Sequence, residues 1–371
     1  MSGIQPQCEG NGPSAVEASG SDIDDFLWNF GSWLTDEDEY SDIIISTRIR
    51  LARNLKGYRF PNRASNAELR EVLQQVRRTC QECESLKNGT YVDIEKLSEW
   101  DCKYFVERRL ASPQLIENAY PSLLIIASRE SLSIMVNEED HLRIQCLEAG
   151  FRIDRAWEKI SQVDDELEEG LTFSYSDRFG YLTACPTNLG TGLRVSIFVH
   201  LPALSFRSET QSVIQQLPTS EIAVRGFYGE GTESIGNVFQ ISNQLTLGRT
   251  EKSVVERLRW TANKLVELER EARARLLKEK ETKVEDAVFR ALGVLRHARI
   301  MSSLEAMDLL SLLRLGLELG MISDISRVAI NQLMVLIQPA HLQKIYSKGL
   351  DADERDIVRA EFIRQNLWME N

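Results

Sequence analysis

The chain has 371 residues, which is long enough for two domains and a sizeable core. With 43% hydrophobic and 27% charged residues, its composition is that of a globular protein. No apolar run approaches the roughly 20 residues of a membrane span, and residues 1–20 lack the basic start and apolar centre of a signal peptide. These features exclude a membrane protein, and we expect a cytoplasmic one.

The net charge of -12 is concentrated at the start of the chain. Residues 1–40 contain nine acids and no Lys or Arg, so the rest is almost balanced and has no broad basic face. We therefore expect no nucleic-acid partner. The six cysteines are scattered, with a single CxxC at Cys80 and Cys83, and the four histidines are dispersed. We predict reduced thiols and no protein-bound metal site.

In chain order, residues 1–21 are expected to be a disordered acidic tail, and residues 22–40 a short helix around Trp33 and Leu34. Helices are predicted at 66–83, 152–169 and 209–216. Strand-like runs recur at 43–51, 123–126, 132–136, 142–145, 193–201, 221–224 and 238–241. Short turns join several neighbouring strands, which favours an α+β fold with an antiparallel sheet.

The pattern changes near Glu251. Apolar residues from Val254 to Leu276 recur at three- and four-residue spacing, which predicts a long amphipathic helix. We assign residues 256–280 to a connecting helix and 281–371 to a small all-helical domain, with breaks near Gly320, Pro339 and Gly349. Residues 22–255 then form the first domain.

The first long predicted strand contains the sequence STRIRL at residues 46–51. Because strand side chains alternate between faces, Ser46, Arg48 and Arg50 share one face, with the two arginines about 7 Å apart. The opposite face carries Thr47, Ile49 and Leu51 and can be buried. Two guanidinium groups at this spacing suit neighbouring phosphates of a nucleotide. The alternative is an exposed face with ordinary salt bridges.

Three consecutive acids, at residues 138–140, follow the apolar run 132–136. They make a poor strand interior, so a bulge or turn is expected there. If the strand resumes, Glu139, His141 and Arg143 line one face. A carboxylate beside an arginine could hold a cationic substrate next to an anionic one; a solvated acidic turn is the alternative.

A glycine-rich turn at 185–194 leads into another strand, with Cys185 before the turn and Arg194 after it. The thiol is reactive only if nearby cations lower its pKa, and a buried inert cysteine is the alternative. His200, on the same strand face as Arg194, is interpreted as a packed or surface residue.

Residues 225–236 contain four glycines, which is typical of a mobile loop that closes over a substrate. Glu230 lies in the middle of this loop and Arg225 at its base; a long flexible hairpin is the alternative. Neither a P-loop nor the motifs of ordinary protein kinases are present. A bound nucleotide would therefore be held by arginines and backbone amides, with Mg²⁺ bridging the phosphates.

Together, these four segments resemble, in order, the motifs of the ATP:guanido phosphotransferases, the family of arginine and creatine kinases. The resemblance implies ATP and Mg²⁺ as cofactors, and catalytic roles for Glu230, Glu139, Arg225, Arg143, Arg194 and Cys185. It assigns the nucleotide to Ser46, Thr47, Arg48, Ile49, Arg50, Arg143, Arg194, Val195, Ser196, Ile197, Phe198, Arg225, Gly226, Phe227, Tyr228, Gly229 and Glu230. One departure is Arg109, which stands where the family usually has His; if this position touches the adenine, nucleotide affinity differs here.

The layout resembles the bacterial protein arginine kinases in particular. Only 45 residues precede the first motif, and about 100 helical residues follow the catalytic part. The segment 240–248 (QISNQLTLG) also resembles this branch. Near the end, Arg355, Asp356 and Arg359 match the motif by which the branch binds phosphoarginine as an allosteric signal. The alternatives are a kinase for free arginine or another small guanidino compound, and a non-catalytic phosphoarginine-binding adaptor.

The resemblance also implies a mechanism and partners. Glu230 would take a proton from the substrate guanidinium, Glu139 would align it, and the arginines would neutralise the phosphates. Protein substrates with exposed arginine, a homodimer formed through the helical domain, an activator protein and a Clp-type protease are the expected partners.

Overall fold

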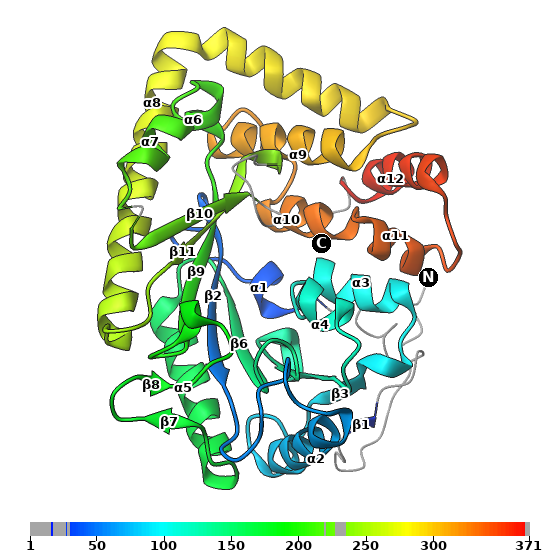
Figure 1. Cartoon of the computed structure of the whole chain (residues 1–371). Helices are drawn as coiled ribbons and strands as arrows, with labels where there is room; N and C mark the ends of the chain where they lie inside the picture. The colour runs from blue at the N-terminus through cyan, green and yellow to red at the C-terminus, as the bar shows by residue number, and fades with distance from the viewer. Residues whose placement is uncertain (1–15, 18–26, 28–29, 219, 227–234, 368–371) are drawn as a thin grey trace.

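The computed structural model describes residues 16–17, 27, 30–218, 220–226 and 235–367. A nine-stranded sheet lies at its centre, in the order β1-β3-β4-β5-β6-β2-β9-β11-β10 (Figure 1). Every pairing is antiparallel except that of β1 with β3. The predicted α+β fold with an antiparallel sheet is confirmed.

The strands of the large sheet are β1 (Val16–Glu17), β2 (Ile44–Arg53), β3 (Thr90–Asp93), β4 (Leu123–Ile126), β5 (Leu132–Val136), β6 (Leu142–Ala149), β9 (Leu193–His200), β10 (Ile222–Gly226) and β11 (Val238–Asn243). The predicted bounds of β4 and β5 are those observed. Strands β2 and β6 run further than predicted because they pair with each other over eight residues, which no local pattern reveals. A separate hairpin consists of β7 (Tyr175–Ser176) and β8 (Gly180–Tyr181).

The helices that precede the last strand, β11, in the chain are α1 (Ser32–Thr35), α2 (Asn66–Glu82), α3 (Glu99–Glu107), α4 (Pro113–Glu117), α5 (Ile153–Gly170), α6 (Pro202–Phe206) and α7 (Thr210–Gln216). Local sequence explains the start of α2, where Ser65 and Glu68 form a capping box. Helix α5 buries an apolar stripe that repeats every three to four residues and includes Ala156, Ile160 and Val163.

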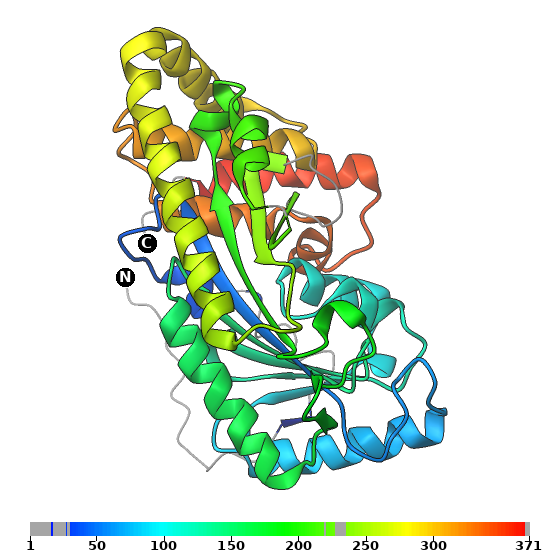
Figure 2. The same cartoon turned by 60° about the vertical axis from the view of Figure 1, so that its left-hand side comes forward.

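The two faces of the sheet have different neighbours. Helices α5 and α8 (Glu251–His297) cover one face, as Figure 2 shows. Thr47, Ile49 and Leu51 point into this layer and are at most 1% exposed, so the predicted alternation of β2 is confirmed. The other face of β2 therefore presents Ser46, Arg48 and Arg50.

The helical region is α8 followed by α9 (Ser303–Glu318), α10 (Arg327–Leu336), α11 (Pro339–Ile345) and α12 (Ala352–Asn366). The element α8 extends well beyond residues 256–280, and Lys280 has non-helical angles (φ -141°, ψ 25°), so the chain bends where the connecting helix was expected to end. Among the described residues, no helix is both long and apolar enough to cross a membrane. The expected disordered tail lies mostly outside them, although Val16–Glu17 pair with β3.

Arg314 of α9 fixes the helical region to the sheet. It is fully buried and donates to the carbonyl oxygens of Ser41 (2.6 Å) and Asp42 (3.1 Å), just before β2. Its Nη1 also donates to Nδ1 of His200 at 2.7 Å, while Nε2 of that ring lies 2.8 Å from Oγ of Ser311. Burial and the charge of Arg314 hold the pKa of His200 well below its usual value, so the ring is neutral. The interpretation of His200 as a packed residue is confirmed.

We predict that Arg314→Met destabilises the protein by about 3 kcal/mol, because the Ser41 carbonyl oxygen and His200 lose their Arg314 donor and the Asp42 carbonyl oxygen keeps only the bond from Arg273. Urea unfolding followed by circular dichroism measures the change. The control Arg259→Met removes an exposed ion pair to Asp154 and should cost at most about 0.5 kcal/mol. Equal losses in the two variants would contradict a special role for Arg314.

Candidate active site

The register of the sheet collects the predicted arginines on its open face. Arg50 of β2 lies directly opposite Arg194 of β9, and Arg225 of β10 lies opposite Gln240 of β11. On the other side of β2, Arg143 of β6 is paired with Ala52, two residues beyond Arg50. Because directly paired residues share a face, Arg48, Arg50, Arg143, Arg194 and Arg225 project from the same side. We call these five residues the arginine face.

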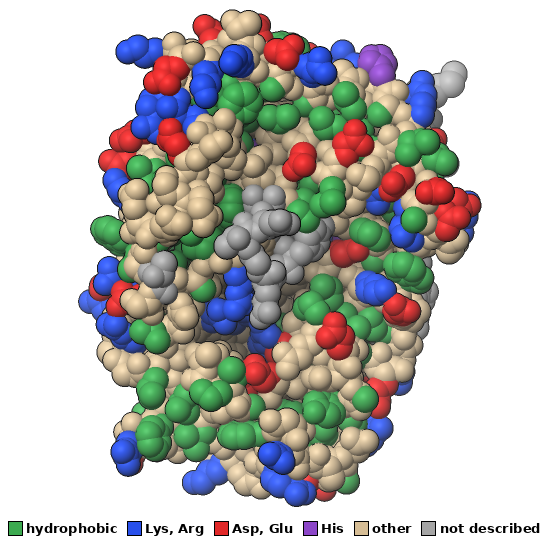
Figure 3. Space-filling model, turned by 45° about the horizontal axis from the view of Figure 1, so that its top comes forward, with side chains coloured by type: hydrophobic (Ala, Val, Ile, Leu, Met, Phe, Trp, Pro, Cys, Tyr) green, Lys and Arg blue, Asp and Glu red, His purple; other side chains and the backbone are tan. Residues whose placement is uncertain are grey.

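A cavity of about 710 Å³ opens onto the arginine face between the sheet, α3 and the helical region. Arg48, Arg50 and Arg143 line it, and a smaller cavity of about 80 Å³ shares Arg50 and Arg143 and adds Arg194. Figure 3 shows a hollow in the molecule with Lys and Arg side chains at its floor. The site therefore offers several cations to one polyanion.

The hydrogen-bonding capacity of these arginines is only partly used. Nε of Arg48, Arg50 and Arg194 is buried and has no hydrogen-bond partner within the part of the chain that the structure describes. Arg48 makes one bond, from Nη2 to Oε1 of Gln240 at 2.9 Å. Buried guanidinium donors are normally satisfied. The set thus fits a ligand rich in acceptor oxygens, such as a nucleotide triphosphate.

Electrostatics point to the same ligand. Burial, followed by repulsion from neighbouring arginines, holds the pKa of Arg48 and Arg50 well below the ordinary value, and that of Arg194 at about 10. An arginine side chain stays protonated in proteins, so these shifts indicate cations short of counter-charge. A polyphosphate would supply that charge.

The acidic segment forms a sharp bend next to the arginine face, as predicted. Asn137 takes a left-handed conformation (φ 60°), and its side chain donates to the carbonyl oxygens of Leu69 and Pro121. Glu138 is buried and accepts from Arg143 and Ser112. Although burial alone would lower the pKa of Arg143, the Glu138 carboxylate raises it, so this pair fixes one cation of the site.

His141 does not line the site. The chain turns at this residue instead of resuming a strand, and the ring is fully buried. Its Nδ1 accepts from the backbone of Leu55 at 3.1 Å, and its Nε2 lies 3.0 Å from the carbonyl oxygen of Arg59. Burial lowers its pKa to about 4, so it is a neutral structural residue. The expected common face of Glu139, His141 and Arg143 is wrong for His141.

Cys185 and Glu139 meet at the edge of the site. Sγ of Cys185 lies 3.0 Å from Oγ1 of Thr187, and Thr187 lines the 80 Å³ cavity together with Glu139. Burial, with the neighbouring Asp140 charge, raises the pKa of Glu139 above its ordinary value. Arg194 lines the same cavity as Glu139. The structure therefore brings together Glu139, Cys185, Arg143 and Arg194.

Other predicted residues lie elsewhere or outside the described chain. Thr47, Ile49, Val195 and Ile197 are buried on the opposite face of the sheet, so their side chains do not reach the cavity. Ser46, Ser196 and Phe198 lie on the open face, and Gly226 ends β10 beside Arg225. The remaining predicted residues lie outside the described part: Phe227, Tyr228, Gly229 and Glu230.

Two residues of the cavity were not among the predicted site residues. Gln240 holds Arg48, and the guanidinium of Arg109 lies 4.1 Å above the ring of Phe198. Gln240 could have been found only through the pairing of β11 with β9, which places it opposite Phe198. Arg109 comes from a turn after α3, with a positive φ of 62°, and the sequence pointed to it only because the family usually has His at this position.

The residues expected to bind phosphoarginine lie on α12. Arg355 lines the far end of the 710 Å³ cavity, near Trp100, and donates to the Leu350 carbonyl oxygen at 2.8 Å. Arg359 is 2% exposed and donates to the carbonyl oxygens of Ile337 and Met301 and to Asp356. Of these three residues, Arg355 is therefore the one that the structure places on the cavity.

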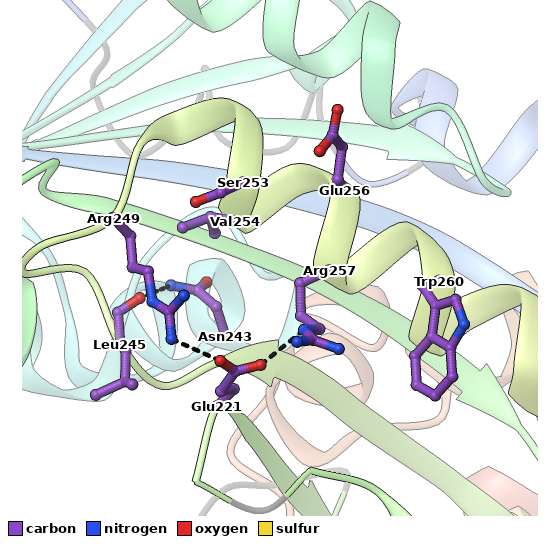
Figure 4. A pocket seen from close by; sticks show the side chains of 9 residues that line it. All are labelled: Glu221, Asn243, Leu245, Arg249, Ser253, Val254, Glu256, Arg257 and Trp260. Atoms are coloured by element: carbon purple, nitrogen blue, oxygen red, sulfur yellow. Dashed lines mark hydrogen bonds and ion pairs between the residues drawn. The ribbon is translucent and has the colours of Figure 1, made fainter.

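A second pocket, of about 310 Å³, lies at the start of α8. Arg249 and Arg257 both point toward Glu221 there, each with an N–O distance of 2.6 Å, and Trp260 lies beyond them (Figure 4). None of its lining residues belongs to the arginine face. The two arginines of this second pocket already share one carboxylate, so the 710 Å³ cavity is the better candidate for binding a polyphosphate.

Comparison with known proteins identifies the class of this site. Residues 71–272 match the family described as ATP:guanido phosphotransferase, C-terminal catalytic domain. Residues 281–371 match the Protein-arginine kinase McsB C-terminal domain. The chain belongs to the ATP:guanido phosphotransferase family.

Its relatives define the branch. The chain is 44% identical over 341 residues to the protein-arginine kinase of Halothermothrix orenii, covering 92% of this chain and 97% of the relative. It is 42% identical to that of Bacillus subtilis, covering 91% and 94%. Within the family the chain therefore belongs to the protein arginine kinases, and the predicted ATP-dependent arginine kinase activity is confirmed.

Solved structures agree on the fold. A duplicated taurocyamine kinase from Schistosoma mansoni, solved with transition-state analogue components, has a TM-score of 0.58 at 25% identity, covering 70% of this chain and 36% of that one. A lombricine kinase has a TM-score of 0.56 at 23% identity, covering 70% and 73%. The sheet with its helical layer is thus the guanidino kinase fold.

The raised pKa of Glu139 predicts an acid limit to activity. Glu139 must be ionised to attract a guanidinium, and its carboxylate takes up a proton at a higher pH than the ordinary 4.5. The rate should therefore fall as the pH drops toward a midpoint above that value. The rate of ADP release, measured from pH 5 to 8, gives this midpoint. The Glu139→Gln variant should release ADP slowly, and its rate should no longer fall as the pH drops. If the acid fall in rate is unchanged in this variant, the titration belongs to another group.

Proposed function

We propose that the arginine face binds the phosphates of ATP and that Glu139 and Glu230 guide an arginine side chain of a protein toward the γ-phosphorus. The observation that carries this proposal is the set of buried Nε atoms on Arg48, Arg50 and Arg194 that have no hydrogen-bond partner among the described residues. Mg²⁺, held by the phosphates and water, would add further charge neutralisation. Among the described residues there is no cluster of three or more metal-ligating side chains.

The reaction needs an unprotonated guanidino nitrogen. An arginine with a pKa above 12 is a poor nucleophile until a proton is removed. We assign this proton to Glu230, while Glu139 aligns the planar group from the opposite side. The nitrogen then bonds to the γ-phosphorus, the bond to the β–γ bridging oxygen breaks, and ADP leaves. Arg143, Arg194 and Arg225 stabilise the charge on the transferring phosphoryl group.

The Cys185 side chain lies near the same carboxylate and opposes the rise that burial causes in the pKa of Glu139. We assign Cys185 the role of keeping this side chain oriented toward the substrate. Arg109 supports the nucleotide end, because its guanidinium covers the Phe198 ring beside Arg48. Other members of the family usually have His at this position, so we expect the affinity for the nucleotide to depend on the residue found there.

The helical region serves regulation and assembly in this proposal. Phe289, Ile300, Leu304 and Ile357 each expose between 47% and 64% of their area on this region. Scattered apolar side chains are common on monomers, but four large ones on one helical unit favour a homodimer contact. Arg355, with Asp356 and Arg359 behind it, would receive phosphoarginine at the end of the nucleotide cavity. We also propose that the protein acts in a cytoplasmic stress response, together with an activator protein and a Clp-type protease.

Two variants separate nucleotide binding from chemistry. Arg48→Ala should raise the Kd for ATP by about tenfold, because a charged hydrogen-bond partner is lost. Glu230→Ala should lower phosphoryl transfer by at least about 100-fold while leaving the Kd for ATP within about twofold. Fluorescent nucleotide titration and ADP release measure the two effects. The exposed Glu256→Ala is the control; a fully active Glu230→Ala would refute its role as the base.

The protein substrate is tested against free arginine. Only an arginine-containing protein should acquire acid-labile phosphate at an appreciable rate, because the relatives that are 42–44% identical to this chain are protein-arginine kinases. Incubation with [γ-³²P]ATP and either free arginine or an unfolded arginine-rich protein distinguishes them. Faster labelling of free arginine would favour the small-molecule kinase. ATP consumption that depends on Glu230 excludes a non-catalytic adaptor.

A further inference from the structure

The turn at residues 185–192 carries Cys185 and lies beside Glu139, because Thr187, Asn188 and Gly192 line the same 80 Å³ cavity as that carboxylate. Its beginning is fixed to the acidic bend, because Asp140 Oδ1 accepts from the backbone N–H of Ala184 and from Nδ2 of Asn54, each at 2.6 Å. The same Asn54 nitrogen donates to the carbonyl oxygen of Leu182 at 3.0 Å. The start of the turn is thus tied to the acidic bend that carries Glu139.

The end of the turn is held by a residue from another part of the chain. Oγ1 of Thr246 lies 2.9 Å from the carbonyl oxygen of Thr187 and 2.7 Å from that of Leu189. Thr246 is 4% exposed. A hydroxyl group has a single proton to donate. That proton is shared between the carbonyl oxygens of Thr187 and Leu189, or alternates between them.

The backbones on the two sides touch at Gly190. This glycine has a φ of +110°, and a Cβ there would come within 2.8 Å of the Thr246 carbonyl oxygen and 2.9 Å of the Leu247 Cα. No larger residue fits without moving backbone. The segment after β11 therefore forms the surface on which the end of the turn rests.

That segment is itself anchored to the sheet. The Asn243 side chain accepts from the backbone of Val195 at 2.8 Å and donates to the carbonyl oxygens of Leu193 (3.1 Å) and Leu245 (3.2 Å). Arg194 lies on strand β9 between Leu193 and Val195. Leu245 and Leu247, on either side of Thr246, point outward and are 43% and 51% exposed. Thr246 is thus the inward-facing side chain of a segment fixed to the arginine face.

We propose that Thr246 is a positioning residue for catalysis, which holds the 185–192 turn, and Cys185 with it, beside Glu139 where the substrate guanidinium binds. The proposal rests on the placement of that guanidinium beside Glu139. The geometric demand is strict, since displacing a reacting group by about 1 Å can cost a factor of about 100 in rate. Thr246 touches neither the nucleotide-binding arginines nor Glu139, so it acts through the turn.

Thr246→Val keeps the shape of the side chain and removes the hydroxyl. We expect kcat for arginine phosphorylation to fall about tenfold while the KM for ATP stays within about twofold, because the arginine face is untouched. Thr246→Ser retains the hydroxyl and should restore kcat to within about twofold of the natural protein. Leu247→Ala, on the outward side of the same segment, is the matched control and should leave kcat unchanged.

A second measurement follows the turn directly. The rate at which iodoacetamide labels each cysteine, read from peptide masses, should rise about fivefold at Cys185 in Thr246→Val and stay unchanged at the buried Cys80 and Cys146. A normal kcat in Thr246→Val would overturn the proposal, as would an equal loss in Thr246→Ser. So would faster labelling of all three cysteines together, which would indicate a general loss of stability. The Arg48 and Glu230 variants test the underlying placement of substrates independently.

Discussion

The organising constraint of this molecule is the gathering of like charges on one face of a sheet. Two guanidinium groups about 7 Å apart repel by roughly 2 kcal/mol at an effective dielectric constant of 20, and Arg48, Arg50, Arg143 and Arg194 all influence one another. Only a rigid support can hold such a set together before its ligand arrives. The antiparallel sheet provides this support, because its register fixes the positions of the arginines.

The surrounding residues limit the cost of this arrangement without neutralising it. Glu138 pairs with Arg143, and Gln240 offers Arg48 a neutral acceptor. The arginine Nε atoms that find no partner in the described part of the chain belong to residues that line the two cavities. Catalysis of phosphoryl transfer depends mainly on positioning and charge stabilisation, so a site that is short of anions before binding is prepared for its substrate.

The helical region is coupled to this site through buried polar contacts. Arg314 joins α9 to the residues that precede β2, and Ser311 of the same helix contacts His200 at the end of β9. Backbone N–H of Gly236, just beyond residues 227–234, donates to Asp308 at 3.1 Å. Helix α9 thus contacts the residues before β2, the end of β9 and Gly236. The cavity itself reaches from Arg48 to Arg355 on α12.

Residue patterns alone were enough for the class of fold, the strands β4 and β5, the alternation of β2 and the family, because each depends on local periodicity or on a motif of consecutive residues. They could not show that His141 turns inward, since the bend is fixed by Asn137 bonding to Leu69 and Pro121 far along the chain. They did not place Gln240 and Thr246 in the site, although both lie in the segment 240–248 that resembles the branch, and they pointed to Arg109 only through the family resemblance. These residues reach it only through strand pairing and long-range contacts, which are decided by how the whole chain packs and leave no mark on the neighbouring sequence.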